Sequence, residues 1–206
     1  MQQAETDYLA ILNSLAERQV EFIVVGGVSA VLQGAPIATF DLDVVHSLSA
    51  ENVQKLLKAL DELNASYRTG GNRNLKPEPS HFSSPRRQLL MTRFGPLDLL
   101  GSIGKDRRYE ELLTESRLMP IGSGLEVRVL DLSMVIKTKE ETAHEKDVAV
   151  LAILRRTLEE KKRQRISNAL PRALAARAPW AVWSIPPNAI VEDGGGHSCE
   201  SIFSSS

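Results

Sequence analysis

Three aspartates are the residues of this chain whose types and spacing could do chemistry. Asp41 and Asp43 are two residues apart in TFDLDVVH (39–46), and Asp98 lies in a second apolar segment, GPLDLLG (95–101). Residues two apart on a strand project from the same face, so we expect Asp41 and Asp43 to point together. Two like charges among apolar neighbours are costly to desolvate unless a cation compensates them. Mg²⁺, or Mn²⁺ in its place, suits such a position because it takes oxygen ligands and keeps room for substrate phosphates.

The position of Asp98 determines whether a third carboxylate joins this pair. If its segment forms a strand beside the first one, three carboxylates converge on one spot. Three carboxylates and a triphosphate could hold two metals about 3.5–4 Å apart, clamping the attacking and leaving oxygens of a phosphoryl transfer. A D-x-D pair by itself is more often a solvated turn or helix cap. The apolar setting and the third carboxylate favour the metal site.

Two glycines precede the first aspartates. EFIVVGG (21–27) predicts a buried strand that ends in a tight turn, followed by a short helix over 28–33. Gly26 and Gly27 would let the backbone approach a ligand and aim free amides at it. Ser29 would lie in the first helical turn, where its hydroxyl could donate to a phosphate oxygen. A strand-to-helix turn without a ligand is the alternative. The spacing is not G-x-G-x-x-G, which disfavours a dinucleotide-binding fold.

Helices and strands alternate along most of the chain, which predicts an α/β (α+β) fold with a small mixed sheet and packed helices. The alternation over 39–46 places Phe40, Leu42 and Val44 on the side opposite the aspartates. RQLLMTRF and GPLDLLGSI predict a hairpin joined around Gly95-Pro96. The remaining elements expected are helices over 5–19, 50–63 (capped by Ser49) and 144–165, a strand over 125–130, and a helix that starts after Asp131.

In order and spacing, these residues resemble the DNA polymerase β-type nucleotidyltransferase superfamily. More narrowly, the chain resembles the small bacterial AbiEii/MenT-like nucleotidyltransferases. The resemblance covers roughly residues 5–163 through the linked motifs FIVVGGVSAVLQG, TFDLDVV, LLMTRFGPLDLLGSIG and KEETAHEKDVAVL. It implies a minimal nucleotidyltransferase fold that uses an NTP as substrate with Mg²⁺ or Mn²⁺.

The same resemblance implies a role for each site residue. All three aspartates would be catalytic and would bind metal, and Asp98 would also help to activate the acceptor hydroxyl. The residues implied to contact the nucleotide are Gly26, Gly27, Ser29, Lys139 and Lys146. The alternative for the two lysines is a solvated helix surface with nearby glutamates as partners.

The chain departs from the relatives at two positions. Many of them carry an arginine before the T-x-D-x-D segment, where this chain has Ile37 between Pro36 and Ala38. They also tend to have a basic residue two before the Lys-Asp pair, where this chain has His144. Losing guanidinium donors weakens bidentate phosphate binding. Nucleotide binding is therefore better supported than transfer.

The implied activity is metal-dependent transfer of a nucleoside monophosphate from an NTP to a hydroxyl group, with release of pyrophosphate. The acceptor could be an RNA 3′ end such as that of tRNA, a protein side chain or a small molecule. Two alternatives stay open. One is a non-catalytic nucleotide-binding or interaction module, and the other is the toxin component of a toxin–antitoxin pair, with an antitoxin as partner.

The composition predicts the class of protein, its compartment and its domain organisation. The 206 residues are 42% hydrophobic with a net charge of −1, which suits one globular domain and gives no global attraction to nucleic acid or anionic membrane. No leader or transmembrane pattern is present and Cys199 is the single cysteine, so we expect a cytoplasmic protein without an intrachain disulfide. We expect a nucleotidyltransferase-like domain over 1–165 and a poorly ordered tail over 166–206. The basic residues of 155–165 fit a solvated helix end better than an RNA-facing stripe.

Overall fold

The computed structural model describes residues 6–68, 75–82, 85–122, 124–142 and 147–176. Met1–Gln164 forms one compact unit, which contains the sheet, and Arg165–Ser206 forms a second, described up to residue 176. The described helices are α1 (Tyr8–Glu17), α2 (Gly26–Leu32), α3 (Ala50–Glu62), the 3₁₀ turn η1 (Pro79–Phe82), α4 (Tyr109–Leu112), α5 (Leu132–Glu141) and α6 (Asp147–Ala176). The strands are β1 (Phe22–Val25), β2 (Leu42–His46), β3 (Ser66–Tyr67), β4 (Gln88–Thr92), β5 (Gly95–Leu100), β6 (Ser116–Pro120) and β7 (Glu126–Leu130).

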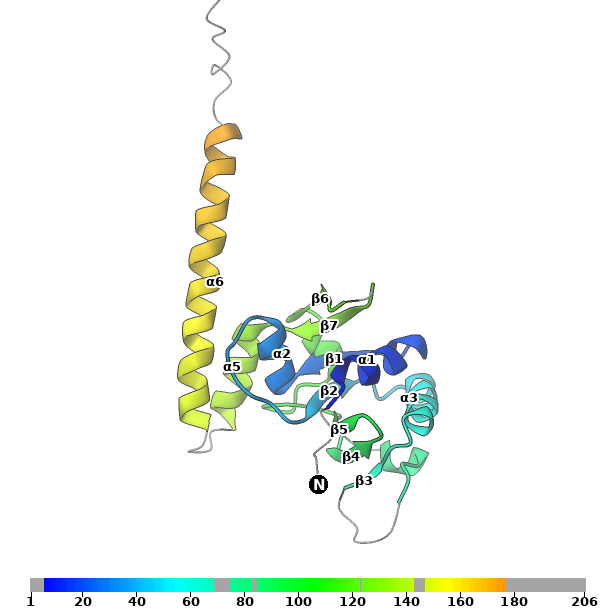
Figure 1. Ribbon diagram of the computed structural model, residues 1–206. Helices are drawn as coiled ribbons and strands as arrows, with labels where there is room; N and C mark the ends of the chain where they lie inside the picture. The colour runs from blue at the N-terminus through cyan, green and yellow to red at the C-terminus, as the bar shows by residue number, and fades with distance from the viewer. Residues whose placement is uncertain (1–5, 69–74, 83–84, 123, 143–146, 177–206) are drawn as a thin grey trace, which may run out of the picture. The chain divides into compact units, whose positions relative to one another are not determined.

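The strands form one mixed sheet in the order β3-β4-β5-β2-β1-β7-β6 (Figure 1). Strand β2 is antiparallel to β1 and parallel to β5, and β1 is parallel to β7. The expected α/β class with a small mixed sheet is therefore confirmed. The central position of β2 between β1 and β5 matters for function, because it brings the glycine turn and both aspartate segments together.

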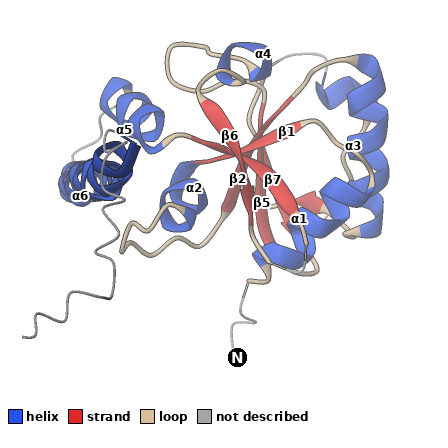
Figure 2. Cartoon of the chain, turned by 90° about the horizontal axis from the view of Figure 1, so that it is seen from above, coloured by secondary structure: helices blue, strands red, loops and turns tan. Residues whose placement is uncertain are grey.

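Period-2 alternation along the strands sends side chains into a core on each face of the sheet. Helices α1 and α3 pack on one face, where Leu42 and Val44 of β2 are buried (Figure 2). Helices α2 and α5 lie on the other side, where Val45 of β2 belongs to a second buried cluster with Val135 of α5. Asp43 shares the strand face of Val45, so the aspartates lie on the face away from α1 and α3.

Several expected elements match the structure closely. Ser49 caps α3, since its hydroxyl accepts a hydrogen bond from the Asn52 amide at 3.2 Å. Asp131 precedes α5 as expected but makes no side-chain cap bond, because its carboxylate lies 3.5 Å from Nη1 of Arg117. Among the described residues, no helix combines the length and apolar content needed to cross a bilayer.

The expected hairpin of β4 and β5 is confirmed, while three details of local structure differ from the expectations. Phe40 is 80% exposed, because β2 begins only at Leu42 and the residues before it leave the sheet. The hairpin turns at residues 93–94, and Gly95 already pairs with Thr92, since strand pairing continues through Pro96. The edge strand β6 was not expected, because its pattern of half-buried and exposed residues has no clear alternation.

Helix α6 is longer than expected. It continues through residues 166–176, past the expected helix end at residue 165. This stretch, ISNALPRALAA, is rich in alanine and leucine, which are strong helix formers, although it also contains Pro171. The expected boundary between domain and tail stays a prediction. The rest of the expected tail, 177–206, lies outside the described residues.

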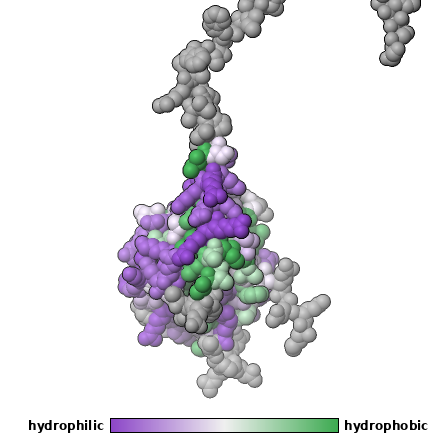
Figure 3. Space-filling model, turned by 90° about the vertical axis from the view of Figure 1, so that its left-hand side faces the viewer, coloured by the Kyte–Doolittle hydropathy of each residue, from purple (hydrophilic) through white to green (hydrophobic). Residues whose placement is uncertain are grey.

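Charged residues on the first part of α6 are paired within the first unit. Arg155 donates to Glu140 Oε1 at 2.6 Å, and Arg156 lies 3.0 Å from Glu160 Oε1. The face seen in Figure 3 carries both hydrophilic and hydrophobic side chains, and Val148 of α6 is among the exposed hydrophobic residues at 67%. These pairs agree with a solvated helix surface over this part of α6.

Candidate active site

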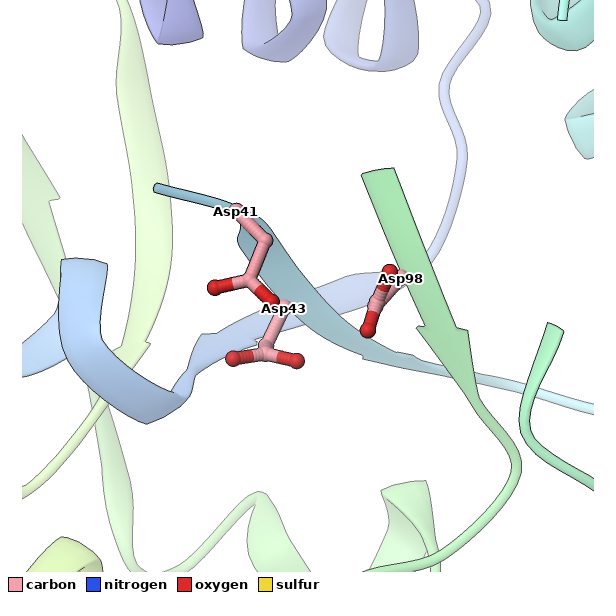
Figure 4. A group of neighbouring side chains, drawn as sticks. All are labelled: Asp41, Asp43 and Asp98. Carbon is pink, nitrogen blue, oxygen red and sulfur yellow. The ribbon is translucent and has the colours of Figure 1, made fainter. Parts of the chain in front are cut away.

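The three aspartates meet at one place on the sheet. Strands β2 and β5 run parallel with Asp43 directly beside Asp98, and Asp41 precedes β2 by one residue. One carboxylate oxygen from each of the three residues lies within 4.8 Å of the other two (Figure 4). The convergence expected from the sequence is confirmed, and it follows from the parallel pairing of two strands that are far apart in the chain.

Burial makes this cluster electrostatically demanding. Asp98 is fully buried and the Asp43 side chain is 18% exposed. Burial, and next the neighbouring charge of Asp41, raise the pKa of Asp43 from 3.8 to about 6. Nearby cations act in the opposite direction without cancelling this effect. A carboxylate in such a position favours a cation nearby.

Two arginines that sequence reasoning missed supply positive charge to the cluster. Arg68 donates to Oδ1 of Asp98, and Arg87 donates to Oδ2 of Asp98 through Nε at 3.1 Å. Nη2 of Arg87 also lies 3.8 Å from Oδ1 of Asp43. Arg68 follows β3 and Arg87 precedes β4, so the two arginines lie at the ends of a segment rich in turn-forming residues. Their position beside Asp98 depends on strand pairing that the sequence does not display.

The glycine turn has a steric reason. Gly26 has a φ of 63°, and a Cβ at this position would collide with Oδ2 of Asp43. A Cβ on Gly27 would collide with the hydroxyl of Thr39. Both residues are therefore needed to let the start of α2 approach the segment that carries the aspartates. Binding of a triphosphate by the two glycines stays a prediction.

Ser29 is placed differently from what the sequence suggested. It is fully buried, and its hydroxyl donates to the carbonyl oxygen of Leu130 at 2.7 Å. The side chain of Gln33 donates to the same carbonyl at 2.8 Å and to the Ser29 carbonyl at 3.0 Å. In this structure the Ser29 hydroxyl thus joins α2 to the end of β7, because the helix turns this side chain toward the sheet. Its phosphate contact remains untested.

A cavity of about 400 Å³ opens beside the aspartates. Gly26, Asp43 and Arg87 line one side of it, and Lys139 of α5 lines another. The charge of Lys139 acts to lower the pKa of Asp43, against the larger effects of burial and Asp41. The structure therefore brings Lys139 to the predicted site. Lys146 and His144 lie outside the described residues.

The residues present fit a divalent cation. The donor set consists of carboxylate oxygens, which Mg²⁺ and Mn²⁺ prefer. Asp43 has a raised pKa, so a cation would stabilise its ionised form. Asp41, Asp43 and Asp98 are the residues that would hold such an ion.

Comparison with solved structures identifies the fold. The lincosamide antibiotic adenylyltransferase LnuA, solved with lincomycin bound, superposes with a TM-score of 0.51 at 16% sequence identity, covering 74% of this chain and 98% of LnuA. This chain has the nucleotidyltransferase fold. A protein from Thermotoga maritima described as a candidate nucleotidyltransferase gives a TM-score of 0.47 at 19% identity, covering 74% of this chain and 93% of that one. ANT(2″)-Ia in complex with adenylyl-2″-tobramycin gives 0.46 at 14% identity, covering 80% and 94%.

No protein-family model matches the sequence, and no curated protein does. At such low identities the structural likeness establishes the fold and no more. The narrower AbiEii/MenT-like resemblance therefore stays a prediction. What this fold does in this chain must be argued from the side chains at the site.

Proposed function

We propose that this protein is a metal-dependent nucleotidyltransferase that moves a nucleoside monophosphate from an NTP to an acceptor hydroxyl. The observation that carries the proposal is the convergence of three carboxylates beside the glycine turn, with oxygens within 4.8 Å of one another. The nucleotidyltransferase fold supports it. So does the adjoining cavity, where Lys139 and Arg87 face the position that a triphosphate would take.

The chemistry is mainly positioning and charge neutralisation. The acceptor hydroxyl gives its proton to a carboxylate of the site, its oxygen forms a bond to the α-phosphorus, the bond from the α-phosphorus to the bridging oxygen breaks, and pyrophosphate leaves. A divalent cation, when bound, polarises the phosphoryl oxygens and neutralises the charge that develops on them. Asp41, Asp43 and Asp98 would hold that cation, and Asp98 would also help to activate the acceptor hydroxyl.

The other predicted residues act on the phosphates. Gly26 and Gly27 let the backbone of α2 approach closely, so their amides would bind phosphate oxygens. Lys139 would neutralise the β- and γ-phosphates as a point charge. Lys146 is assigned the same role by resemblance. The acceptor, whether tRNA, protein or small molecule, and a toxin role with an antitoxin partner remain predictions.

One observation favours a second candidate, a binding module that holds a nucleotide without transferring it. Both oxygens of Asp98 accept from guanidinium groups, those of Arg68 and Arg87. A carboxylate so engaged is less able to orient an acceptor. This candidate predicts nucleotide binding without any transfer.

Label transfer separates the two candidates. The purified full chain is incubated with each α-labelled NTP, Mg²⁺ or Mn²⁺, and total tRNA, a protein extract or small hydroxyl compounds. Asp43→Asn is the test variant. Asp61→Asn is the matched control, because it removes the same charge from an exposed position on α3, where the side chain is 76% exposed.

We expect label to move to one acceptor class, with a loss of about 100-fold or more in Asp43→Asn and no change in Asp61→Asn. Nucleotide binding without transfer to any fraction would identify the binding module instead. A protein that binds neither metal nor nucleotide would contradict both candidates.

A further inference from the structure

Arg87 contacts two of the three carboxylates, and its side chain is partly exposed to solvent. Its Nε donates to Asp98 Oδ2 at 3.1 Å, and its Nη2 lies 3.8 Å from Asp43 Oδ1. The Arg87 side chain is 56% exposed, whereas Asp98 is fully buried. A half-exposed guanidinium on a buried carboxylate has open space into which it can turn.

The backbone beside Arg87 is firmly held. The neighbouring Gln88 is buried, pairs with Leu99 across the sheet, and donates from Nε2 to the carbonyl of His81 at 3.0 Å. Its Oε1 accepts from the hydroxyl of Tyr67 at 2.8 Å. The Arg87 side chain can therefore change rotamer while its backbone stays in place.

Arg68 behaves differently at the same aspartate. It donates to the opposite oxygen, Oδ1, and its side chain is 26% exposed, about half the exposure of Arg87. Asp98 therefore keeps one guanidinium partner if Arg87 leaves. Arg87 donates to Oδ2 of Asp98 through both Nε and Nη2, whereas Arg68 donates once, to Oδ1. The greater exposure of Arg87 is what gives its side chain room to move.

A cation and Arg87 compete for the same two carboxylates. The Asp43 and Asp98 carboxylates that Arg87 contacts belong to the cluster that could hold a metal ion. A guanidinium and a divalent cation repel each other at such short range. Binding of the cation therefore favours a position of the Arg87 side chain away from the carboxylates.

The adjoining cavity offers Arg87 a second position. Arg87 lines this cavity together with Gly26 and Lys139, the residues proposed to face the triphosphate. A guanidinium binds phosphate with two parallel hydrogen bonds.

We propose that Arg87 exchanges between two positions, on the Asp43 and Asp98 carboxylates and on the triphosphate, so that cation binding delivers its guanidinium to the nucleotide. The exchange rests on the proposed function. It makes Arg87 a competitor of the metal and a ligand of the nucleotide. Removing it must therefore change the two affinities in opposite directions, which a merely structural arginine would not do.

The test measures both affinities without requiring turnover. Mn²⁺ binding to the full chain is followed by the electron paramagnetic resonance of free Mn²⁺, with no nucleotide present. NTP binding is measured by calorimetry at saturating Mg²⁺. The variants are Arg87→Gln and Arg87→Lys, and the control is Arg86→Gln, which removes the same charge from the adjacent exposed residue.

We expect Arg87→Gln to bind Mn²⁺ about tenfold more tightly and NTP about tenfold more weakly, the size of one charge-assisted hydrogen bond. Arg87→Lys keeps the charge but loses the planar fork, so NTP binding alone should weaken. Arg86→Gln should leave both affinities within about twofold.

Unchanged or weaker Mn²⁺ binding in Arg87→Gln, with the melting temperature of the wild type, would overturn the exchange. The exchange would also be overturned if Arg87→Gln bound Mn²⁺ more tightly but NTP binding were unchanged in Arg87→Gln and in Arg87→Lys. These results would leave the proposed function standing. A wild-type protein that binds neither Mn²⁺ nor NTP would overturn the proposed function and the exchange with it.

Discussion

Replacing Asp43 by asparagine should stabilise the protein near neutral pH. The pKa of Asp43 is raised from 3.8 to about 6 by burial and by Asp41, so its ionised form costs folding free energy. A rise of about 2 units corresponds to about 3 kcal/mol at 1.36 kcal/mol per unit. The attraction of Arg87, whose Nη2 lies 3.8 Å from Asp43 Oδ1, is already part of this net shift. We therefore expect Asp43→Asn to raise the free energy of unfolding by about 3 kcal/mol at pH 7–8.

The pH dependence gives this prediction its sign. Between pH 3.8 and about 6 the folded protein keeps a proton on Asp43 that the unfolded chain releases, so wild-type stability falls as pH rises through this window. The advantage of the variant should therefore be full above pH 6 and should vanish toward pH 4. Urea unfolding at pH 4, 5, 6, 7 and 8, without added metal, measures it, with Asp61→Asn as the control. A variant that is less stable at pH 7–8, or an advantage that does not change with pH, would refute the reasoning.

Three further changes test how the site is positioned. Gly26→Ala should lower the free energy of unfolding by about 3 kcal/mol, and Gly34→Ala by about 1 kcal/mol. Both glycines have a positive φ, but only at Gly26 would a Cβ meet other atoms. Equal losses of stability in thermal unfolding would contradict the steric account. Arg107 holds Glu141 with two hydrogen bonds of 2.6 and 2.7 Å and lowers the pKa of that carboxyl from 4.5 to about 2. The loss of unfolding free energy in Glu141→Gln should therefore be full above pH 4.5 and should shrink as pH falls toward 2. A difference between the urea midpoints of wild type and variant that stays constant from pH 7 to 3 would count against this. Gln33→Leu should cost about 3 kcal/mol in urea unfolding, because the buried Gln33 side chain bonds to the backbone of α2, β7 and α5, and a cost below about 1 kcal/mol would show that these bonds are replaced.

The aspartate cluster could be predicted because it depends on strand periodicity and on one pairing. Alternation put Asp43 on the face opposite Leu42 and Val44, and the structure keeps that arrangement. Asp98 lay in a segment apolar enough to be a buried strand, so pairing beside the first aspartate strand was an open condition of the prediction. The structure meets that condition with parallel pairing of β2 and β5. The glycines before α2 were informative for the same reason, since few other residues fit against Asp43.

The rest of the site depends on tertiary contacts that leave no local pattern. Arg68 and Arg87 flank a segment of turn-forming residues, and nothing in its composition shows that both ends return to Asp98. The inward direction of the Ser29 hydroxyl is set by the carbonyl of Leu130, a residue about 100 positions away. Phe40 fitted the expected alternation, but β2 begins only after it, at Leu42, and boundaries of this kind are poorly marked in a sequence.

A crystal structure of the full chain with Mg²⁺ and a non-hydrolysable NTP would test the central claim most directly. We predict cation density bounded by oxygens of Asp41, Asp43 and Asp98, and a triphosphate that lies along Gly26 and Lys139 in the cavity beside them. A triphosphate bound elsewhere on the chain, with no cation among the three carboxylates, would contradict the account.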